Sequence, residues 1–171
     1  IIFGSLNGGL FRVPGGGGEP EVLTSPDADE GEGRYDHPSV IPGRQAVLFV
    51  IEVGDGSAAD QLAVLALDTG EVTQLGLAGT QPQYASTGHL VYAVGDGSVR
   101  AAPFDVERLE VTGNPVPILD GVVVNGTSGT ANFSIAANGR LVYASGAGSG
   151  GARSLQAARP MSPKTRSRPP P

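Results

Sequence analysis

Acidic side chains gather in one short segment, and carboxylates clustered in this way can hold Ca²⁺. The spacing does not fit an EF-hand loop, because a glycine stands at the fifth position of the run and a glutamate at the sixth. We interpret the segment as a solvated loop between structural repeats, with a weak cation site as the alternative, and assign no metal ligand. Its acidic residues are Asp27, Asp29, Glu30, Glu32 and Asp36.

The chain contains two histidines, His37 and His89. This number is too small for a histidine-rich zinc site. Either one could act as a general base, but no serine stands in a G-x-S-x-G nucleophile elbow. We therefore interpret both as structural or surface residues, although His37 precedes an inner strand and could face a channel. The sequence indicates no catalytic residue and no cofactor.

Four consecutive glycines occupy residues 15–18. Glycine-rich loops cradle phosphate where they open a helix whose N-terminal amides bind the anion. No helical pattern follows these glycines, and no lysine stands in the Walker position. The run is predicted to be a flexible hairpin loop.

Composition favours a fold of short strands. The 171 residues suit one domain, and 39% hydrophobic content supplies a core. Glycine and proline, at 27 and 14 residues, stand at roughly twice their usual level, which argues against a helix bundle. The absence of cysteine excludes disulfide and thiolate chemistry. No apolar run approaches the length of a membrane-spanning helix.

Charge is distributed unevenly. Residues 1–150 hold all 17 acidic residues and six basic ones, whereas residues 151–171 hold five basic residues and no acidic one. An acidic body repels phosphates, so a nucleic-acid partner is not expected. The basic, proline-rich segment 151–171 cannot bury a core and is predicted to be a disordered tail, with a docking arm for an acidic partner as the alternative.

A short apolar strand that ends in an aromatic residue recurs four times. The aromatic positions are spaced by 46, 43 and 51 residues, and they are Phe3, Phe49, Tyr92 and Tyr143. Three copies follow a glycine turn, at Gly43, Gly88 and Gly139, where glycine supplies the positive φ of a tight hairpin. Further strand candidates precede and follow each copy. Pro117 is compatible with a fourth strand only if that strand lies at an edge.

Four antiparallel strands repeated at this period are typical of β-propeller blades. An immunoglobulin-like sandwich or a helical or leucine-rich repeat fits the pattern less well. Residues 37–76 and 82–120 each supply a complete blade, residues 1–24 the last three strands of a blade, and residues 131–145 the first two of another. A closed ring needs at least four blades. We therefore expect an all-β, incomplete propeller over residues 1–150, as an arc of a larger ring whose missing blades come from the same parent chain.

The repeat resembles that of bacterial TolB-like (WD40-like) propellers. The stretch HPSVIPGR at 37–44, followed by VLF at 47–49, has the family's proline-opened inner strand and glycine-arginine turn, although it lacks the family's aspartate. Residues 9–14 and 18–24 resemble the second half of the repeat, and the resemblance extends to about residue 150. Residues 103–117 resemble propellers carried by bacterial serine/threonine protein kinases. Because these families are bacterial, we interpret the glycosylation-like Asn125-Gly126-Thr127 as a loop turn.

These features favour a non-catalytic propeller that binds a protein or a small ligand at its face or channel. The resemblance implies an extracytoplasmic bacterial module, a sensor or scaffold region attached to a kinase domain that is absent here. The alternative is a fragment of a propeller enzyme, such as a peptidase-associated propeller or a lactonase-like hydrolase, which the lack of catalytic motifs disfavours. Candidate binding residues lie at the entrances of strands, and they are Tyr35, Asp36, His37, Gln81 and Asn132.

Overall fold

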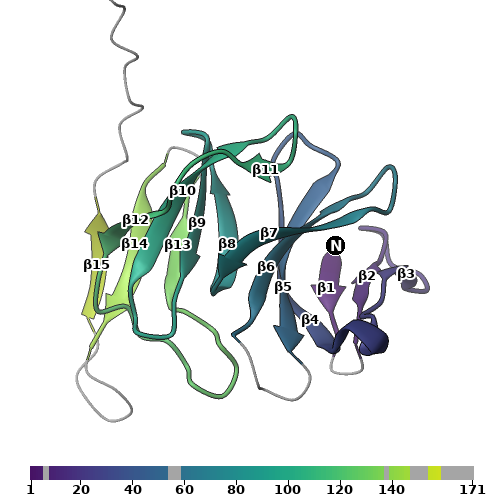
Figure 1. The fold of residues 1–171 in the computed structure, drawn as a ribbon, viewed down its shortest axis with the longest axis horizontal. Coiled ribbons are helices and arrows are strands. Elements are labelled where there is room, and N and C mark those ends of the chain that lie inside the picture. The colour runs from purple at the N-terminus through teal and green to yellow at the C-terminus, as the bar shows by residue number, and fades with distance from the viewer. Residues whose placement is uncertain (6–7, 54–58, 137–138, 147–153, 159–171) are drawn as a thin grey trace, which may run out of the picture.

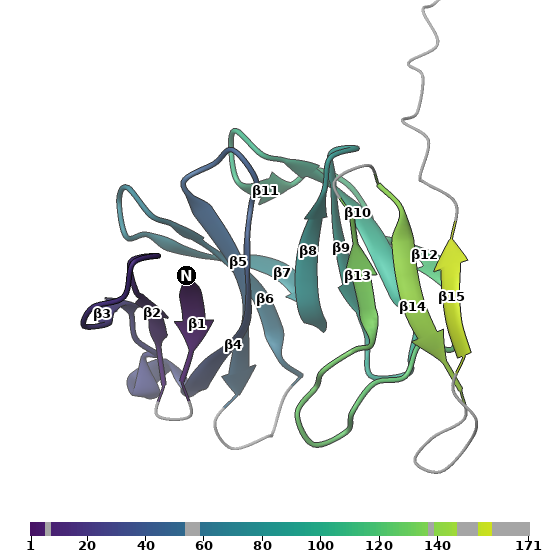
Figure 2. The same cartoon turned by 180° about the vertical axis from the view of Figure 1, so that it is seen from behind.

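The computed structural model describes residues 1–5, 8–53, 59–136, 139–146 and 154–158, and these residues form four antiparallel β-sheets. The sheets follow one another along the chain and lie side by side in an arc (Figures 1 and 2). The described helical content is one 3₁₀ turn, η1 (Ala28–Glu30), which is too short to cross a membrane. The all-β prediction is therefore confirmed.

Two sheets form the first half of the arc. The first sheet contains β1 (Ile2–Gly4), β2 (Leu10–Arg12) and β3 (Glu21–Thr24). The second sheet contains β4 (Glu32–Val40), β5 (Ala46–Val53), β6 (Gln61–Ala66) and β7 (Val72–Ala78), paired in that order. The loop between β2 and β3 holds the four glycines, so the predicted hairpin loop is confirmed there.

The third sheet contains β8 (Thr80–Ala85), β9 (His89–Ala93) and β10 (Val99–Asp105), and its fourth strand is divided in two. β11 (Glu110–Val111) pairs with the end of β10, and β12 (Val116–Leu119) pairs with its beginning. β12 pairs with β10 alone, so Pro117 lies on an edge strand, where its missing N–H is not needed. The prediction for Pro117 is confirmed.

The fourth sheet corrects the sequence analysis at its last strand. It contains β13 (Phe133–Ile135), β14 (Leu141–Ser145) and β15 (Ser154–Ala158), which makes three strands where two were predicted. β15 lies within 151–171, so the disordered tail was wrong for these five residues. Composition misled the prediction because strand pairing uses backbone groups, whereas the basic and proline-rich character comes mainly from residues 159–171. Those residues, and 151–153, lie outside the described part.

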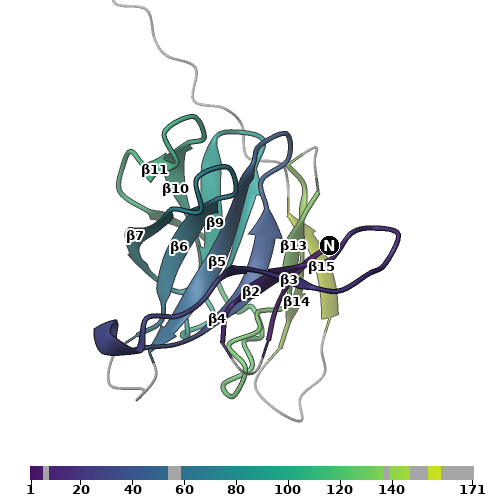
Figure 3. The ribbon, with the colours of Figure 1, turned by 90° about the vertical axis from the view of Figure 1, so that its right-hand side faces the viewer.

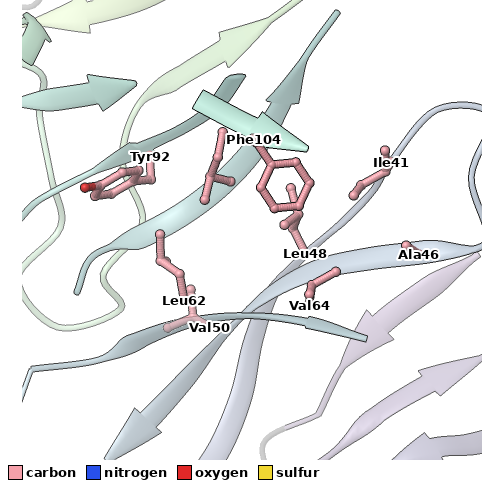
Figure 4. Close-up of a cluster of buried hydrophobic side chains, with 9 residues drawn as sticks. Ile41, Ala46, Leu48, Val50, Leu62, Val64, Tyr92 and Phe104 are labelled. Carbon is pink, nitrogen blue, oxygen red and sulfur yellow. The ribbon is translucent and has the colours of Figure 1, made fainter. Parts of the chain in front are cut away.

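Hydrophobic clusters fill the spaces between neighbouring sheets. The strands β5 and β6 are apolar on both faces, as strands sandwiched between two sheets must be. One face of this pair packs against the first sheet, and the other packs against the third, where Tyr92 and Phe104 cover Leu48, Val50, Leu62 and Val64 (Figure 4). The turn glycines Gly43 and Gly88 have φ of 74° and 80°, as predicted for the two hairpins.

Candidate functional site

The inner strands β4 and β8 share an irregularity, which lies in the second half of β4 and at the beginning of β8. His37 and Gln81 each have φ of 52°, a left-handed conformation that is unfavourable for a residue with a Cβ atom. Each precedes a proline, and strand pairing shifts register at this point in both sheets. The proline lies where the ladder is interrupted, so its missing N–H costs no hydrogen bond. Two successive repeats thus carry backbone strain at the residue before the proline, which singles out this position in the two strands.

Glutamine side chains link β8 to β13 in the next sheet, and we call Gln81 and Gln83 the glutamine clamp. Gln81 donates from Nε2 to the carbonyl of Phe133 (3.0 Å) and accepts from the N–H of Ala131 (3.0 Å). Gln83 donates to the same carbonyl (3.4 Å) and accepts from the N–H of Ile135 (3.0 Å). The residue with the unfavourable backbone conformation, Gln81, thus makes two hydrogen bonds to the next sheet.

Residues 125–130, which we call the bridging loop, connect the third and fourth sheets. Inside the loop, the Asn125 side chain accepts hydrogen bonds from the N–H groups of Thr127 (2.9 Å) and Ser128 (3.1 Å). This Asx-type turn confirms that Asn125 begins a loop turn. The loop contacts the earlier sheets through Thr80 Oγ1, which donates to the carbonyl of Gly129 (2.8 Å), and through His37 Nε2, which donates to that of Ser128 (3.1 Å). It thus joins β4, β8 and the fourth sheet.

Two adjoining cavities lie beside the bridging loop, and Asp60, Gly126 and Gly129 line both of them. The larger has a volume of about 340 Å³ and walls of small residues and backbone, including Ala78, Gly79, Thr80, Val94 and Val124. The smaller has a volume of about 180 Å³ and charged walls, with Arg34, Asp36, His37 and Glu52. Together they give this face an apolar compartment next to a polar one.

The smaller cavity contains more negative than positive charge. Arg34 Nε donates to Asp36 (2.6 Å) and to Glu52 (2.5 Å). The hydrogen bond to Asp36 raises the pKa of Arg34 above its ordinary value, and the charges of Asp36, Glu52 and Asp60 add to this, against the opposing effect of desolvation. Arg34 is the one arginine or lysine among the described residues that line the cavity, and it faces three carboxylates.

The five candidate binding residues fall into different environments. Asp36 and His37 line the smaller cavity, as a binding role requires. Tyr35 is 3% exposed and packs against Phe49, with ring centroids 4.8 Å apart, so it belongs to the core. Gln81 is occupied by the glutamine clamp. Asn132 is exposed and lines neither cavity; its backbone bonds to Val123 and Ala144.

The other residues singled out by the sequence have local roles. In the acidic segment, Asp27 accepts from the N–H of Asp29, and Glu32 accepts from the N–H of Asp27 and the hydroxyl of Tyr35. Among the described residues, no three histidine or acidic side chains lie close enough to hold a metal ion. His89 Nδ1 lies 3.1 Å from Thr87 Oγ1, beside the turn that opens β9.

Sequence reasoning missed Asp60, Thr80 and the bridging loop. Asp60 precedes β6 with no motif around it, and the loop reaches β4 across 91 residues of sequence. One signal in the sequence could have indicated where the cavities lie. A residue followed by proline recurs at the same position in successive blades, as His37-Pro38 and Gln81-Pro82.

Burial raises the pKa of Tyr35 above its ordinary value, and the hydrogen bond to Glu32 raises it further. The stabilisation from the neutral hydroxyl is complete below the unfolded-state pKa of about 10 and is lost as the pH rises above it. Tyr35→Phe is expected to cost about 1 kcal/mol at pH 8 and to lose less stability than the wild type between pH 9 and pH 11. Burial also raises the pKa of Tyr92. Part of the loss of stability at high pH therefore remains in both proteins.

Urea unfolding at the three pH values measures this difference, with Tyr143→Phe as a control for the loss of a hydroxyl. An equal loss of stability in the wild type and Tyr35→Phe between pH 9 and pH 11 would show that Tyr35 does not ionise on unfolding.

No family model and no curated protein matches the chain. Among solved structures, the chain is similar to the crystal structure of TolB from Acinetobacter baumannii, with a TM-score of 0.64 and 16% sequence identity. The alignment covers 91% of this chain and 37% of the TolB chain, so the chain spans little more than a third of that protein's length. At 16% sequence identity, the similarity to TolB shows a shared fold and nothing more. The four sheets therefore form part of a TolB-like β-propeller, and the predicted partial propeller is confirmed.

Proposed function

We propose that the chain is a non-catalytic propeller module that binds a segment of a partner protein in the two cavities beside the bridging loop. The observation that carries this proposal is the pair of adjoining cavities beside the strained positions of β4 and β8. Propeller loops commonly form binding surfaces on a rigid scaffold. Here the scaffold is fixed across three sheets by the glutamine clamp and the bridging loop.

The lining indicates the chemistry of the ligand. Small side chains and backbone around the larger cavity leave room for an apolar side chain of the partner. The excess of carboxylates over Arg34 in the smaller cavity favours a neutral or basic group there. A short peptide that places an apolar residue next to a lysine or arginine matches both compartments.

A substitution that fills the two cavities with a large side chain tests the proposal. Gly126 lines both cavities, its φ lies outside the left-handed region, and a Cβ atom there meets no atom within 4 Å. Gly126→Phe would therefore occupy the site without straining the backbone. Peptides selected from a random library on the wild-type chain are expected to bind Gly126→Phe at least tenfold more weakly, as measured by fluorescence anisotropy.

Gly16→Phe is the matched control, because a Cβ atom at Gly16 also meets nothing within 4 Å and the residue lies in the β2–β3 loop. It should bind the selected peptides as the wild type does. The proposed binding site would be contradicted if the selected peptides bound Gly126→Phe as tightly as the wild type. It would also be contradicted if the selection yielded no binder.

We also propose that the module belongs to a larger bacterial protein, with a serine/threonine kinase as the parent and an extracytoplasmic position. The support is the resemblance of residues 103–117 to kinase-associated propellers. Sequencing the coding region on both sides tests this: a kinase domain and a membrane span upstream support it, and a different catalytic domain in that place contradicts it.

A further inference from the structure

Asp60 lies at the junction of the two cavities. It is half-buried, and it lines both the larger, mainly apolar cavity and the smaller, charged one. The other described residues that both cavities share are Gly126 and Gly129 of the bridging loop, which lies at the lower end of the row of sheets in Figure 3. Among the described residues that the two cavities share, Asp60 is therefore the one with a functional side chain.

The backbone on both sides of Asp60 is held by hydrogen bonds. The carbonyl of Asp60 accepts from the N–H of Gly79 (3.0 Å), and the carbonyl of Ala59 accepts from the side chain of Gln61 (2.8 Å). Gln61 begins β6, which pairs with β5 on one side and β7 on the other. The carboxylate therefore extends from a fixed backbone position, and a ligand has only a short side chain to order.

The carboxylates of the smaller cavity differ in how they are paired. Arg34 Nε forms ion pairs with Asp36 (2.6 Å) and Glu52 (2.5 Å), so one cation serves two carboxylates. The hydrogen bond to Asp36 is the largest cause that raises the pKa of Arg34, and the charge of Asp60 contributes after those of Asp36 and Glu52. Within the described part of the chain, no hydrogen bond or ion pair joins the Asp60 side chain to another group.

This arrangement makes Asp60 sensitive to what occupies the larger cavity. An apolar group bound there removes water from one side of the carboxylate, and a charge that loses water without gaining a partner is costly. A cation bound beside the apolar group supplies that partner, at a place where reduced access of water strengthens the attraction. A ligand with its positive charge next to its apolar group therefore suits Asp60 best.

We propose that Asp60 is the specificity-determining residue of the site and selects a basic side chain in the bound peptide through an ion pair with its ammonium or guanidinium group. The proposal rests on the proposed function, because it concerns a peptide bound in the two cavities. Asp36 and Glu52 remain paired with Arg34. The ion pair also orients the peptide, since it places the cation at the junction and the apolar side chain in the larger cavity.

A double-mutant cycle between the protein and the peptide tests this pairing. Peptides selected on the wild-type chain are compared with versions in which glutamine replaces the basic residue. On the wild type, this replacement is expected to weaken binding about tenfold, as for close charge pairs across protein interfaces. On Asp60→Asn, the two peptides should bind within about twofold of each other, because the partner of the charge is gone. Fluorescence anisotropy measures the four affinities.

Two further variants distinguish Asp60 from the general charge of the site. Glu52→Gln also removes one negative charge from the smaller cavity but keeps Asp60, so the difference between the two peptides should remain about tenfold. Asp120→Asn is the matched control, because Asp120 is exposed and lines neither cavity, and it should bind both peptides as the wild type does. Circular dichroism with thermal melting checks that all variants fold.

The outcomes separate the role of Asp60 from the peptide site itself. A difference between the two peptides that persists on Asp60→Asn, or that disappears equally on Glu52→Gln, would overturn the role of Asp60. So would selected peptides that lack a basic residue. In each case the peptide site stands if Gly126→Phe still weakens binding. A selection without binders, or binders that Gly126→Phe does not weaken, would overturn the site and the role of Asp60 together.

Discussion

Phe49→Ala is expected to lower the free energy of unfolding by about 3–5 kcal/mol, the usual cost of deleting a buried ring and leaving a cavity. Phe49 is fully buried in β5, between the first and second sheets, and its ring contacts Tyr35. Native domains have a total stability of about 5–15 kcal/mol, so this one substitution should bring the protein close to unfolding at room temperature. Urea denaturation followed by circular dichroism measures the change.

Phe3→Ala provides the matched comparison, because Phe3 has the same place in the repeat but is only half-buried, on the side of the first sheet that faces away from the second sheet. This substitution should cost about 1 kcal/mol, since folding withdraws less of the Phe3 ring than of the Phe49 ring from water. Equal costs at the two positions would show that the packing between sheets does not explain the burial of Phe49.

Much of the fold was predictable because it depends on local patterns. Strand alternation, glycine turns and the spacing of the aromatic residues indicated sheets that repeat along the chain, and Gly43 and Gly88 have the predicted positive φ. Pro117 could be placed on an edge because proline lacks a donor. β15 escaped prediction because its pairing depends on backbone bonds to β14, which side-chain composition does not encode.

The candidate site was predictable only in part. The sequence analysis selected Asp36 and His37 as residues before an inner strand; both line the smaller cavity, but they lie within β4, which begins at Glu32. The same criterion selected Tyr35, although strand alternation places it on the face opposite to Asp36, where Phe49 packs. Asp60 and the bridging loop were out of reach, because their neighbours are far away in sequence and no spacing rule connects them.

Gln81→Leu is expected to lower the free energy of unfolding by about 2–4 kcal/mol. The leucine side chain would leave the N–H of Ala131 without its partner and the carbonyl of Phe133 with only the longer bond to Gln83. Ala131 and Phe133 are buried, so water cannot replace the lost bonds without opening the structure. Each unsatisfied buried group costs about 1–3 kcal/mol.

Gln81→Gly separates the hydrogen bonds from the backbone strain. Glycine adopts the φ of 52° without a steric penalty, so this variant should be about 1 kcal/mol more stable than Gln81→Leu while lacking the same bonds. Hydrogen exchange provides a local readout: the amide of Ala131 should exchange at least tenfold faster in both variants. The amide of Ile135 should change less, because Gln83 still holds it. Unchanged protection at Ala131 would show that the clamp does not fasten the fourth sheet to the third.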